Sequence, residues 1–306
     1  MYDTSYVIAV PNAVVPSGAG FPKTKQTGFK TRFRQAGLLP LVGAALLSLA
    51  ACGGGRGSGP VIELGGSTSM VPLVELLAEG FGEHRPGIRL NINSTGSSDG
   101  IRNAGVLYQF GMTSRELTPS EQLLGLYERV IAIDGIALIV HSSNPVSDLS
   151  VETVRGIYTG EITDWAEVSG GSKRGTIAVV TREEGSGTRS AFEEIVGFSG
   201  NLRAGAVESP SSGAVRSNVA GNPDAVGYVS AASVDGSVRA LSIDGFEPSD
   251  DNLRSGSYAI ARPFILLYDE PSPEGREFLE WVLGEGQAIV ARSWLPVGPV
   301  PDGNDR

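Results

Sequence analysis

One local pattern recurs three times in this chain: a β-branched run, then a loop rich in glycine and hydroxyl residues, then an amphipathic helix. The clearest copy lies at 176–196, where Gly-Ser-Gly-Thr at 185–188 joins the run to the helix. The other copies lie at 61–81 and at 88–107, the latter with its helix expected from about residue 101. Parallel strands bring such loops to one edge of a sheet. The pattern therefore predicts an α/β fold that binds a ligand at the carboxyl ends of its strands.

These loops have the chemistry of an anion site. Glycine lets the backbone approach a ligand closely, and the free N–H groups and dipole of a helix N-terminus attract negative charge. Arg182, just before the loop at 185–188, can donate a bidentate fork to an oxyanion. For any one loop, an ordinary capped turn with an exposed arginine is the better explanation. Three copies together favour an anion site.

Two further stretches carry candidate groups. Phe-Gly-Met-Thr-Ser-Arg at 110–115 offers hydroxyls and an arginine, although a turn with a surface arginine explains it equally well. Asp134 lies within the apolar run 130–140, which predicts a central strand. A buried carboxylate needs partners. Asp134 is therefore either a structural acceptor or part of the site.

Composition limits the function. With 306 residues and 41% apolar content, the chain can form one large or two medium domains. The net charge of −10 gives no sign of nucleic-acid binding and no long-range attraction for an anion, so local hydrogen bonds must supply the affinity. The two histidines are far apart and there is one cysteine, which disfavours a catalytic triad and a metal centre. We expect no enzyme, no cofactor and no metal.

The N-terminal segment has the pattern of an export signal. Basic residues at 23–34 precede an apolar segment of 15 residues at 37–51, which is short for a membrane span. Leu-Ala-Ala-Cys at 49–52 resembles the lipobox of bacterial lipoproteins, and Cys52 is the single cysteine of the chain. We expect 1–52 to be a signal peptide with a lipobox, with additional residues before the true start, and 53–59 to be a flexible tether.

Nine stretches in order along the chain resemble the PstS family, the phosphate-binding subunits of bacterial phosphate ABC importers. Among them are Gly-Ser-Thr-Ser-Met-Val-Pro-Leu at 66–73, Thr-Gly-Ser-Ser-Asp-Gly-Ile at 95–101 and Val-Val-Thr-Arg-Glu-Glu-Gly-Ser-Gly-Thr-Arg at 179–189. The others lie at 110–117, 131–140, 144–149, 157–165, 225–230 and 257–263. Each stretch is weak evidence alone, but their ordered combination is specific.

The resemblance implies a type II periplasmic-binding-protein fold, in which two α/β lobes enclose a ligand in a cleft. Two crossover strands form the hinge, and we place them near 135–141 and 259–268. Lobe one is then 60–140 plus 258–306, and lobe two is 141–257.

The resemblance also implies a buried phosphate and the residues that hold it. The expected ligand-binding residues, with Asp134 added from its position, are Thr68, Ser69, Ser97, Ser114, Arg115, Asp134, Arg182, Ser186, Gly187 and Thr188. Some relatives carry an acidic residue at the position of Ser114, which accepts a hydrogen bond from protonated phosphate. The hypothesis that Asp134 takes over this role predicts discrimination against sulfate, which carries no proton near neutral pH.

By this resemblance, we expect an extracytoplasmic lipoprotein, anchored to the cell membrane at Cys52, that captures inorganic phosphate and delivers it to an ABC permease. We expect a monomer that binds no nucleic acid. Two alternatives stay open: a binding protein for another oxyanion such as sulfate or molybdate, and a phosphate sensor or surface adhesin.

Overall fold

The computed structural model describes residues 59–300. The expected signal peptide at 1–52, the lipidation site Cys52 and all but the last residue of the tether at 53–59 lie outside the described residues.

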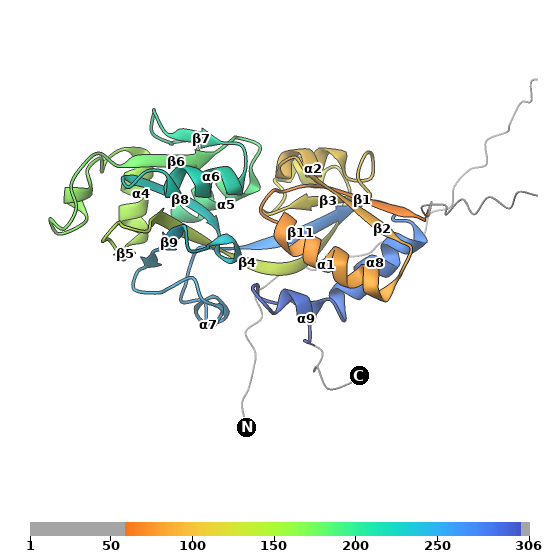
Figure 1. The fold of residues 1–306 in the computed structure, drawn as a ribbon. Helices are drawn as coiled ribbons and strands as arrows, with labels where there is room; N and C mark the ends of the chain where they lie inside the picture. Colours follow the sequence, from red (N-terminus) through yellow and green to blue (C-terminus); the bar gives the residue numbers. More distant parts are fainter. Residues whose placement is uncertain (1–58, 301–306) are drawn as a thin grey trace, which may run out of the picture. The chain divides into compact units, whose positions relative to one another are not determined.

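A mixed sheet organises the described residues, with strand order β2-β1-β3-β11-β4-β8-β6-β7 and with β9 paired to β4. The strands are β1 (Val61–Gly66), β2 (Arg89–Ser94), β3 (Phe110–Thr113), β4 (Tyr127–His141), β6 (Ala178–Arg182), β7 (Val207–Ser209), β8 (Ala225–Ser230), β9 (Val238–Ala240) and β11 (Ala261–Tyr268). The strands β1, β2 and β3 are parallel, and so are β6, β7 and β8. The α/β class predicted from the sequence is therefore present (Figure 1).

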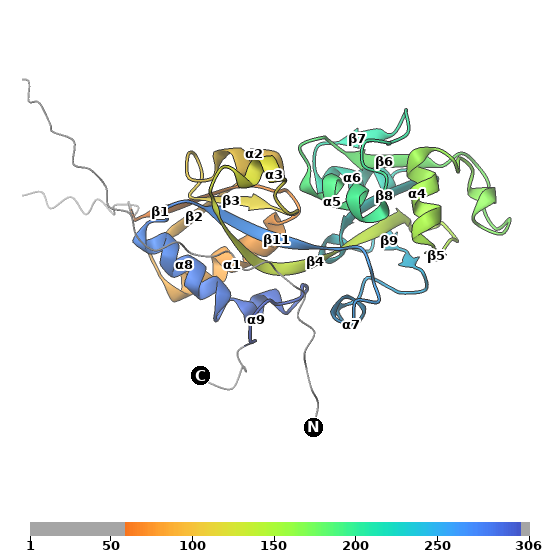
Figure 2. The same ribbon diagram turned by 180° about the vertical axis from the view of Figure 1, so that it is seen from behind.

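Strand β4 joins the two groups of parallel strands. Its first part, 127–135, pairs with β11, and its second part, 136–141, pairs with β8 and β9. Both β4 and β11 run antiparallel to their partners, and β11 also pairs with β3. Figure 2 shows these two strands running between the two groups of elements. The run that the sequence predicted as a central strand is thus central to the whole sheet.

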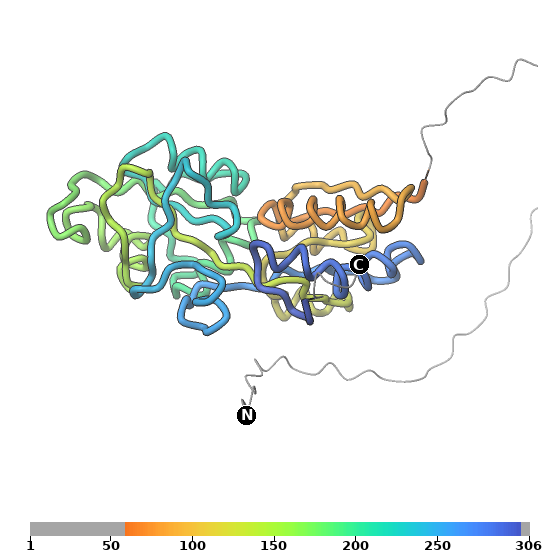
Figure 3. Tube along the Cα trace, turned by 60° about the horizontal axis from the view of Figure 1, so that its bottom comes forward, coloured from red at the N-terminus to blue at the C-terminus, as the bar shows by residue number. Residues whose placement is uncertain are grey.

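The buried apolar side chains form one core at each end of β4. The terminal core consists of side chains from 62–132 and 264–294, and the central core of side chains from 136–260. The first and the last of the described elements thus share one core, and Figure 3 shows the orange and dark blue segments together. The helices of the terminal core are α1 (Val71–His84), α2 (Ser97–Asn103), α8 (Pro273–Leu283) and α9 (Gln287–Val290), and those of the central core are α4 (Val151–Thr159), α5 (Gly187–Val196) and α6 (Ser212–Ala220).

The second Gly/Ser/Thr loop differs from the sequence-based expectation. Helix α2 begins at Ser97, several residues earlier than the expected start near 101. Gly96 adopts a φ of 96°, a left-handed conformation that glycine accepts readily, so the chain turns there and the helix follows at once. The hydroxyl residues of this loop consequently lie in the first turn of the helix.

None of the helices within residues 59–300 is long and apolar enough to cross a membrane.

Candidate functional site

Five buried hydroxyl side chains from both cores form a connected group, which we call the hydroxyl cluster. Its members are Ser67, Ser69, Ser97, Ser114 and Thr188. Ser67 Oγ lies 3.0 Å from Ser69 Oγ and donates to Ser114 Oγ at 2.9 Å. Ser97 Oγ lies 3.3 Å from Ser114 Oγ, and Thr188 Oγ1 donates to Ser69 Oγ at 3.3 Å. Hydroxyls both donate and accept, so the cluster can bind an anion without a net charge of its own.

The topology explains why these hydroxyls meet. Ser67 and Ser69 follow β1, and Ser114 follows β3, the parallel neighbour of β1. The carboxyl ends of these two strands therefore lie at the same edge of the sheet. Ser97 is the first residue of α2, in the terminal core. Thr188 lies in the first turn of α5, which belongs to the central core on the other side of the hinge strands. Backbone contact accompanies this meeting, since Ser98 N–H donates to the carbonyl of Gly185 at 3.1 Å.

Three helices begin beside the cluster, namely α1, α2, whose first residue is Ser97, and α5. Helix α1 begins after Met70, whose side chain makes no capping hydrogen bond within residues 59–300. The backbone N–H groups of an uncapped first turn are donors that suit an anion. Helix α5 is capped, because Ser186 Oγ accepts from Arg189 N–H at 3.3 Å. Of the expected site residues, Ser186 thus serves as the cap of α5.

Gly187 and Thr68 both lie in closely packed surroundings. A Cβ atom on Gly187 would lie 2.2 Å from Ser97 Oγ and 2.8 Å from Ser114 Oγ, so only glycine fits at this point. Thr68 Oγ1 is buried and has no hydrogen-bond partner within residues 59–300. An unpartnered buried hydroxyl is costly unless a ligand satisfies it.

An arginine that the sequence reasoning did not single out reaches the cluster. Arg262 in β11 is 2% exposed, and its Nη1 donates to Ser114 Oγ at 3.3 Å. Its Nε and Nη2 donate to Asp134 Oδ2 at 3.1 and 2.9 Å. A signal existed, because an arginine inside the apolar run 258–268 needs a buried partner just as Asp134 does. Pairing Arg262 with Asp134, each an isolated charge in an apolar run, would have identified Arg262 from the sequence.

Asp134 is held from two sides. Ser230 Oγ donates to its Oδ1 at 2.6 Å, and the Arg262 guanidinium contacts its Oδ2. Burial raises the pKa of Asp134 above its ordinary value, while the charge of Arg262 and the hydrogen bonds from Ser230 and Arg262 oppose that rise. Of the two alternatives that the sequence left open, the structure favours the structural acceptor, which meets the hydroxyl cluster through Arg262.

The two arginines predicted from the sequence have other partners. Arg182 is 1% exposed and ends β6 beside the loop at 185–188, as expected. Its Nε and Nη2 donate to the carboxylate of Glu183 at 2.9 and 2.7 Å. Its Nη1 donates to Ser212 Oγ at 3.2 Å, so the guanidinium contacts the start of α6. The structure thus places Arg182 near the loop with its fork held by a carboxylate.

The side chain of Arg115, an expected ligand-binding residue, points to a carboxylate in this structure. Its Nη1 and Nη2 donate to the carboxylate of Glu121 at 2.7 and 2.8 Å, and Nη1 also donates to the carbonyl of Glu116. Glu121 lies in the short helix α3 (Pro119–Gln122), where it forms a capping box with Thr118. The bidentate pair turns Arg115 towards α3 and lowers the pKa of Glu121 to about 2. Arg115 is therefore not part of the hydroxyl cluster.

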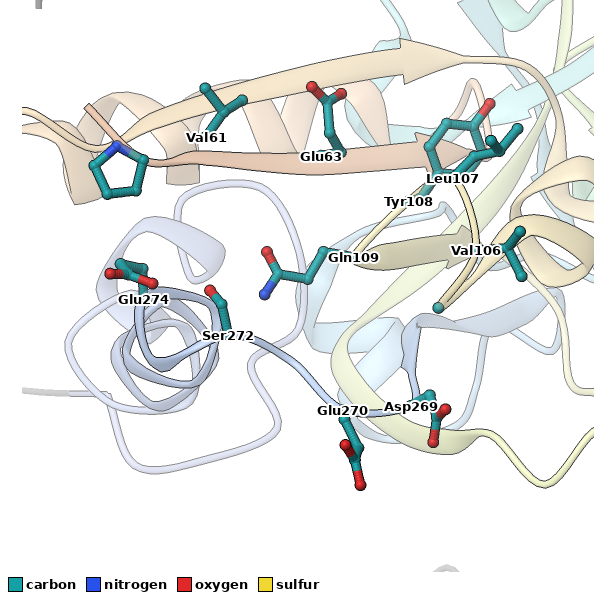
Figure 4. A pocket seen from close by; sticks show the side chains of 12 residues that line it. Val61, Glu63, Val106, Leu107, Tyr108, Gln109, Asp269, Glu270, Ser272 and Glu274 are labelled. Carbon is teal, nitrogen blue, oxygen red and sulfur yellow. The ribbon is translucent and has the colours of Figure 1, made fainter. Parts of the chain in front are cut away.

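A cavity of about 680 Å³ lies elsewhere on the molecule, and none of the hydroxyl cluster lines it. Figure 4 shows Glu63 of β1 on one side and Ser272 and Glu274 at the start of α8 on another, with Asp269 and Glu270 nearby. This acidic lining repels anions. The hydroxyl cluster is thus the better candidate for an anion site.

Comparison with known proteins agrees with the fold. The sequence profile of the PBP superfamily domain matches residues 50–285. The chain is 44% identical to a putative phosphate ABC transporter substrate-binding protein from Clostridium perfringens, solved with bound phosphate, with a TM-score of 0.75 over 78% of this chain and 99% of that one. The chain belongs to the PstS family of this superfamily.

Other members of the PstS family support the assignment. The phosphate-binding protein PstS of Bacillus subtilis is 28% identical over 282 residues, which is 85% of this chain and 93% of that protein. An ABC-type phosphate transport receptor from Vibrio cholerae is 34% identical, with a TM-score of 0.64 over 76% of this chain and 99% of its own. The predicted family and type II fold are thus confirmed. The family consists of solute-binding proteins, which confirms that this protein is not an enzyme.

Proposed function

We propose that this protein binds inorganic phosphate between its two cores and delivers it to the permease of an ABC importer. The hydroxyl cluster carries this proposal, because its hydroxyls come from both sides of the hinge strands and meet beside the uncapped start of α1. The PstS relatives whose names state phosphate binding support the same ligand.

The proposed phosphate-binding residues are those whose donors converge on the cluster. They are Thr68, Ser69, Ser97, Ser114, Gly187 and Thr188, with Ser186 and Arg182 forming the supporting loop. Such an array of short, fixed donors suits a compact tetrahedral oxyanion. In a water-excluded site each hydrogen bond to the charged ligand contributes more than it does in water.

We propose that binding is coupled to closure of two lobes, 60–140 plus 258–306 and 141–257. The hinge is formed by β4, which passes from one core to the other, and by the start of β11, which follows directly on Tyr258 and Ile260 of the central core. A ligand that contacts both lobes has a higher affinity for the closed state and shifts the population towards it. The contacts of Thr188 with Ser69 and of Ser98 with Gly185 belong to that closed state.

We propose that the protein acts outside the cytoplasmic membrane as a monomer. The apolar segment at 37–51 followed by Cys52 supports export and lipid attachment, and the glycine-rich stretch at 53–59 supports a flexible connection to the anchor. A tethered receptor stays close to its permease, which raises the effective concentration of the captured ligand there.

The decisive experiment is calorimetric titration of the purified, ligand-stripped protein with phosphate, followed by titration in the presence of sulfate. Tight phosphate binding without competition by sulfate supports the proposed transport role. Equal binding of both anions widens the ligand to oxyanions in general. Binding of neither anion contradicts the proposal and favours a sensor or an adhesin.

A further inference from the structure

The two hinge strands carry a buried ion pair at their point of contact. Asp134 and Arg262 are direct partners in the register of β4 and β11, and both side chains are 1% exposed. An ion pair at such depth loses the hydration of both charges, which its own attraction offsets only with good geometry. Stability alone is therefore a weak reason for placing the pair here.

Arg262 uses only part of its donor set on Asp134. Its Nε and Nη2 contact one carboxylate oxygen, and its Nη1 extends to Ser114 Oγ at 3.3 Å. Guanidinium has five N–H donors in a rigid fork. Two edges of this fork thus serve different partners, one in the hinge and one in the hydroxyl cluster. The ring of Phe264, 5.3 Å from the guanidinium carbon, packs against the same group and restricts its position.

Asp134 is linked to the other side of the hinge as well. Ser230, the last residue of β8, donates to its Oδ1 at 2.6 Å, while its Oδ2 receives both Arg262 contacts. A continuous chain of hydrogen bonds thus runs from Ser230 through the ion pair to Ser114. None of the three donors to Asp134 belongs to the hydroxyl cluster, so the carboxylate meets the cluster through Arg262, whereas the earlier hypothesis requires it to contact the ligand directly.

We propose that Arg262 contacts the bound anion through Nη1 and that Asp134 is a positioning residue, which holds the guanidinium at the hydroxyl cluster. The proposal rests on the anion site described under the proposed function. The positive charge next to the ligand then comes from the guanidinium of Arg262, which belongs to hinge strand β11. Discrimination between phosphate and sulfate then depends on the hydroxyls of the cluster and not on Asp134. These hydroxyls can accept a hydrogen bond from the protonated oxygen of phosphate.

The first test replaces Arg262 with lysine. Lysine keeps the charge opposite Asp134 but has a single donor group and cannot serve both partners. We expect Arg262→Lys to weaken phosphate binding at least tenfold in calorimetric titration. The control is Arg115→Lys, a buried arginine beside the same cluster residue whose fork is turned to Glu121. We expect that control to bind phosphate as the unaltered protein does.

The second test separates the two roles of Asp134 with the variant Asp134→Asn. If the carboxylate only positions Arg262, phosphate and sulfate affinities change by the same factor and their ratio stays within about twofold. If it accepts the ligand's proton, phosphate affinity falls while sulfate affinity rises or first becomes measurable. The double variant tests the coupling of the two residues. If Asp134 positions Arg262, Arg262→Lys lowers phosphate affinity less in the Asp134→Asn background than in the unaltered protein. If Asp134 is purely structural, the two losses of affinity are additive.

The outcomes are distinct. Arg262→Lys with unchanged phosphate affinity overturns the role of Arg262, and a gain of sulfate binding in Asp134→Asn overturns the positioning role. Circular dichroism and thermal melting identify a variant that fails to fold, in which case the double variant Asp134→Asn with Arg262→Gln, which leaves no unpaired buried charge, repeats the test of Arg262. If the unaltered protein binds neither anion, the proposed function fails instead.

Discussion

Thr188 Oγ1 donates a hydrogen bond to Ser69 Oγ at 3.3 Å, although 119 residues separate them in the chain. Thr188 belongs to α5, which packs in the central core, and Ser69 follows β1 of the terminal core. The two side chains meet only while the two cores are close together. Residues at this contact therefore affect closure more than folding.

The first prediction concerns Gly187→Ala. The added Cβ would lie 2.2 Å from Ser97 Oγ, and Ser97 Cβ is only 2.8 Å away, so rotating the hydroxyl does not remove the clash. We expect phosphate affinity to fall at least a hundredfold, measured by calorimetry, while the free energy of unfolding changes by under about 1 kcal/mol. The matched control is Gly213→Ala in α6, where the new Cβ would meet only Ser211 Oγ at 3.8 Å. Equal affinities of both variants would refute this account.

The second prediction concerns acid stability through Glu121. Its pKa is lowered from 4.5 to about 2, first by the hydrogen bonds from Arg115. A lowered folded-state pKa adds stability that is complete above the unfolded value of 4.5 and is lost as pH falls through about 2. We expect Glu121→Gln to cost about 1–3 kcal/mol at neutral pH, because each pKa unit corresponds to roughly 1.4 kcal/mol and the pair is partly solvated.

Urea unfolding at pH 7 and pH 4 checks this prediction. The difference between Glu121→Gln and the unaltered protein should be smaller at pH 4 than at pH 7. A difference independent of pH would mean that the ion pair with Arg115 does not stabilise the fold.

The third prediction concerns the aromatic group of the central core. Phe192 is fully buried, and its ring stacks on Tyr228 at 4.2 Å between centroids and meets Tyr158 at 5.0 Å. We expect Phe192→Ala to lower the free energy of unfolding by about 3–5 kcal/mol through loss of burial and formation of a cavity. Leu107→Ala, at a side chain that is 63% exposed, is the comparison and should change it by less than about 0.5 kcal/mol. Thermal or urea unfolding of both variants measures the difference.

The fourth prediction concerns membrane attachment. If Cys52 carries a lipid, Cys52→Ser releases the protein from the membrane fraction while phosphate binding by the purified protein stays unchanged. Fractionation of cells and metabolic labelling with a radioactive fatty acid provide the measurement. A Cys52→Ser protein that still sediments with membranes and takes up label would exclude this residue as the anchor.

Local sequence patterns predicted the α/β class and singled out several residues that the structure brings together in the hydroxyl cluster. The β-branched runs and Gly/Ser/Thr loops predicted strand ends, and the ends of β1 and β3 bring Ser69 and Ser114 together. Hydroxyl residues at the carboxyl end of a strand can be predicted, because the sequence shows both the serine or threonine and the β-branched run that precedes it. The family resemblance added the order of the stretches and hence the two crossings.

The contact of Arg262 with Asp134 depends on pairing between distant parts of the chain. Arg262 meets Asp134 through the register of β4 and β11, 128 residues apart, and no local pattern fixes that register. For Arg115 the signal is local. Its partner Glu121 lies six residues further along the chain, in a capping box with Thr118, so the direction of the Arg115 side chain could have been predicted from the sequence.

The terminal core is assembled from both ends of the described part of the chain, and this arrangement affects the order in which the fold can be completed. Strand β11 lies between β3 and β4, so this part of the sheet stays incomplete until residues 261–268 have been synthesised. The strands β1, β2 and β3 are therefore made long before the strand that connects them to β4. The terminal core can close only after the segment 261–294 has been made, and such long-range pairing slows folding.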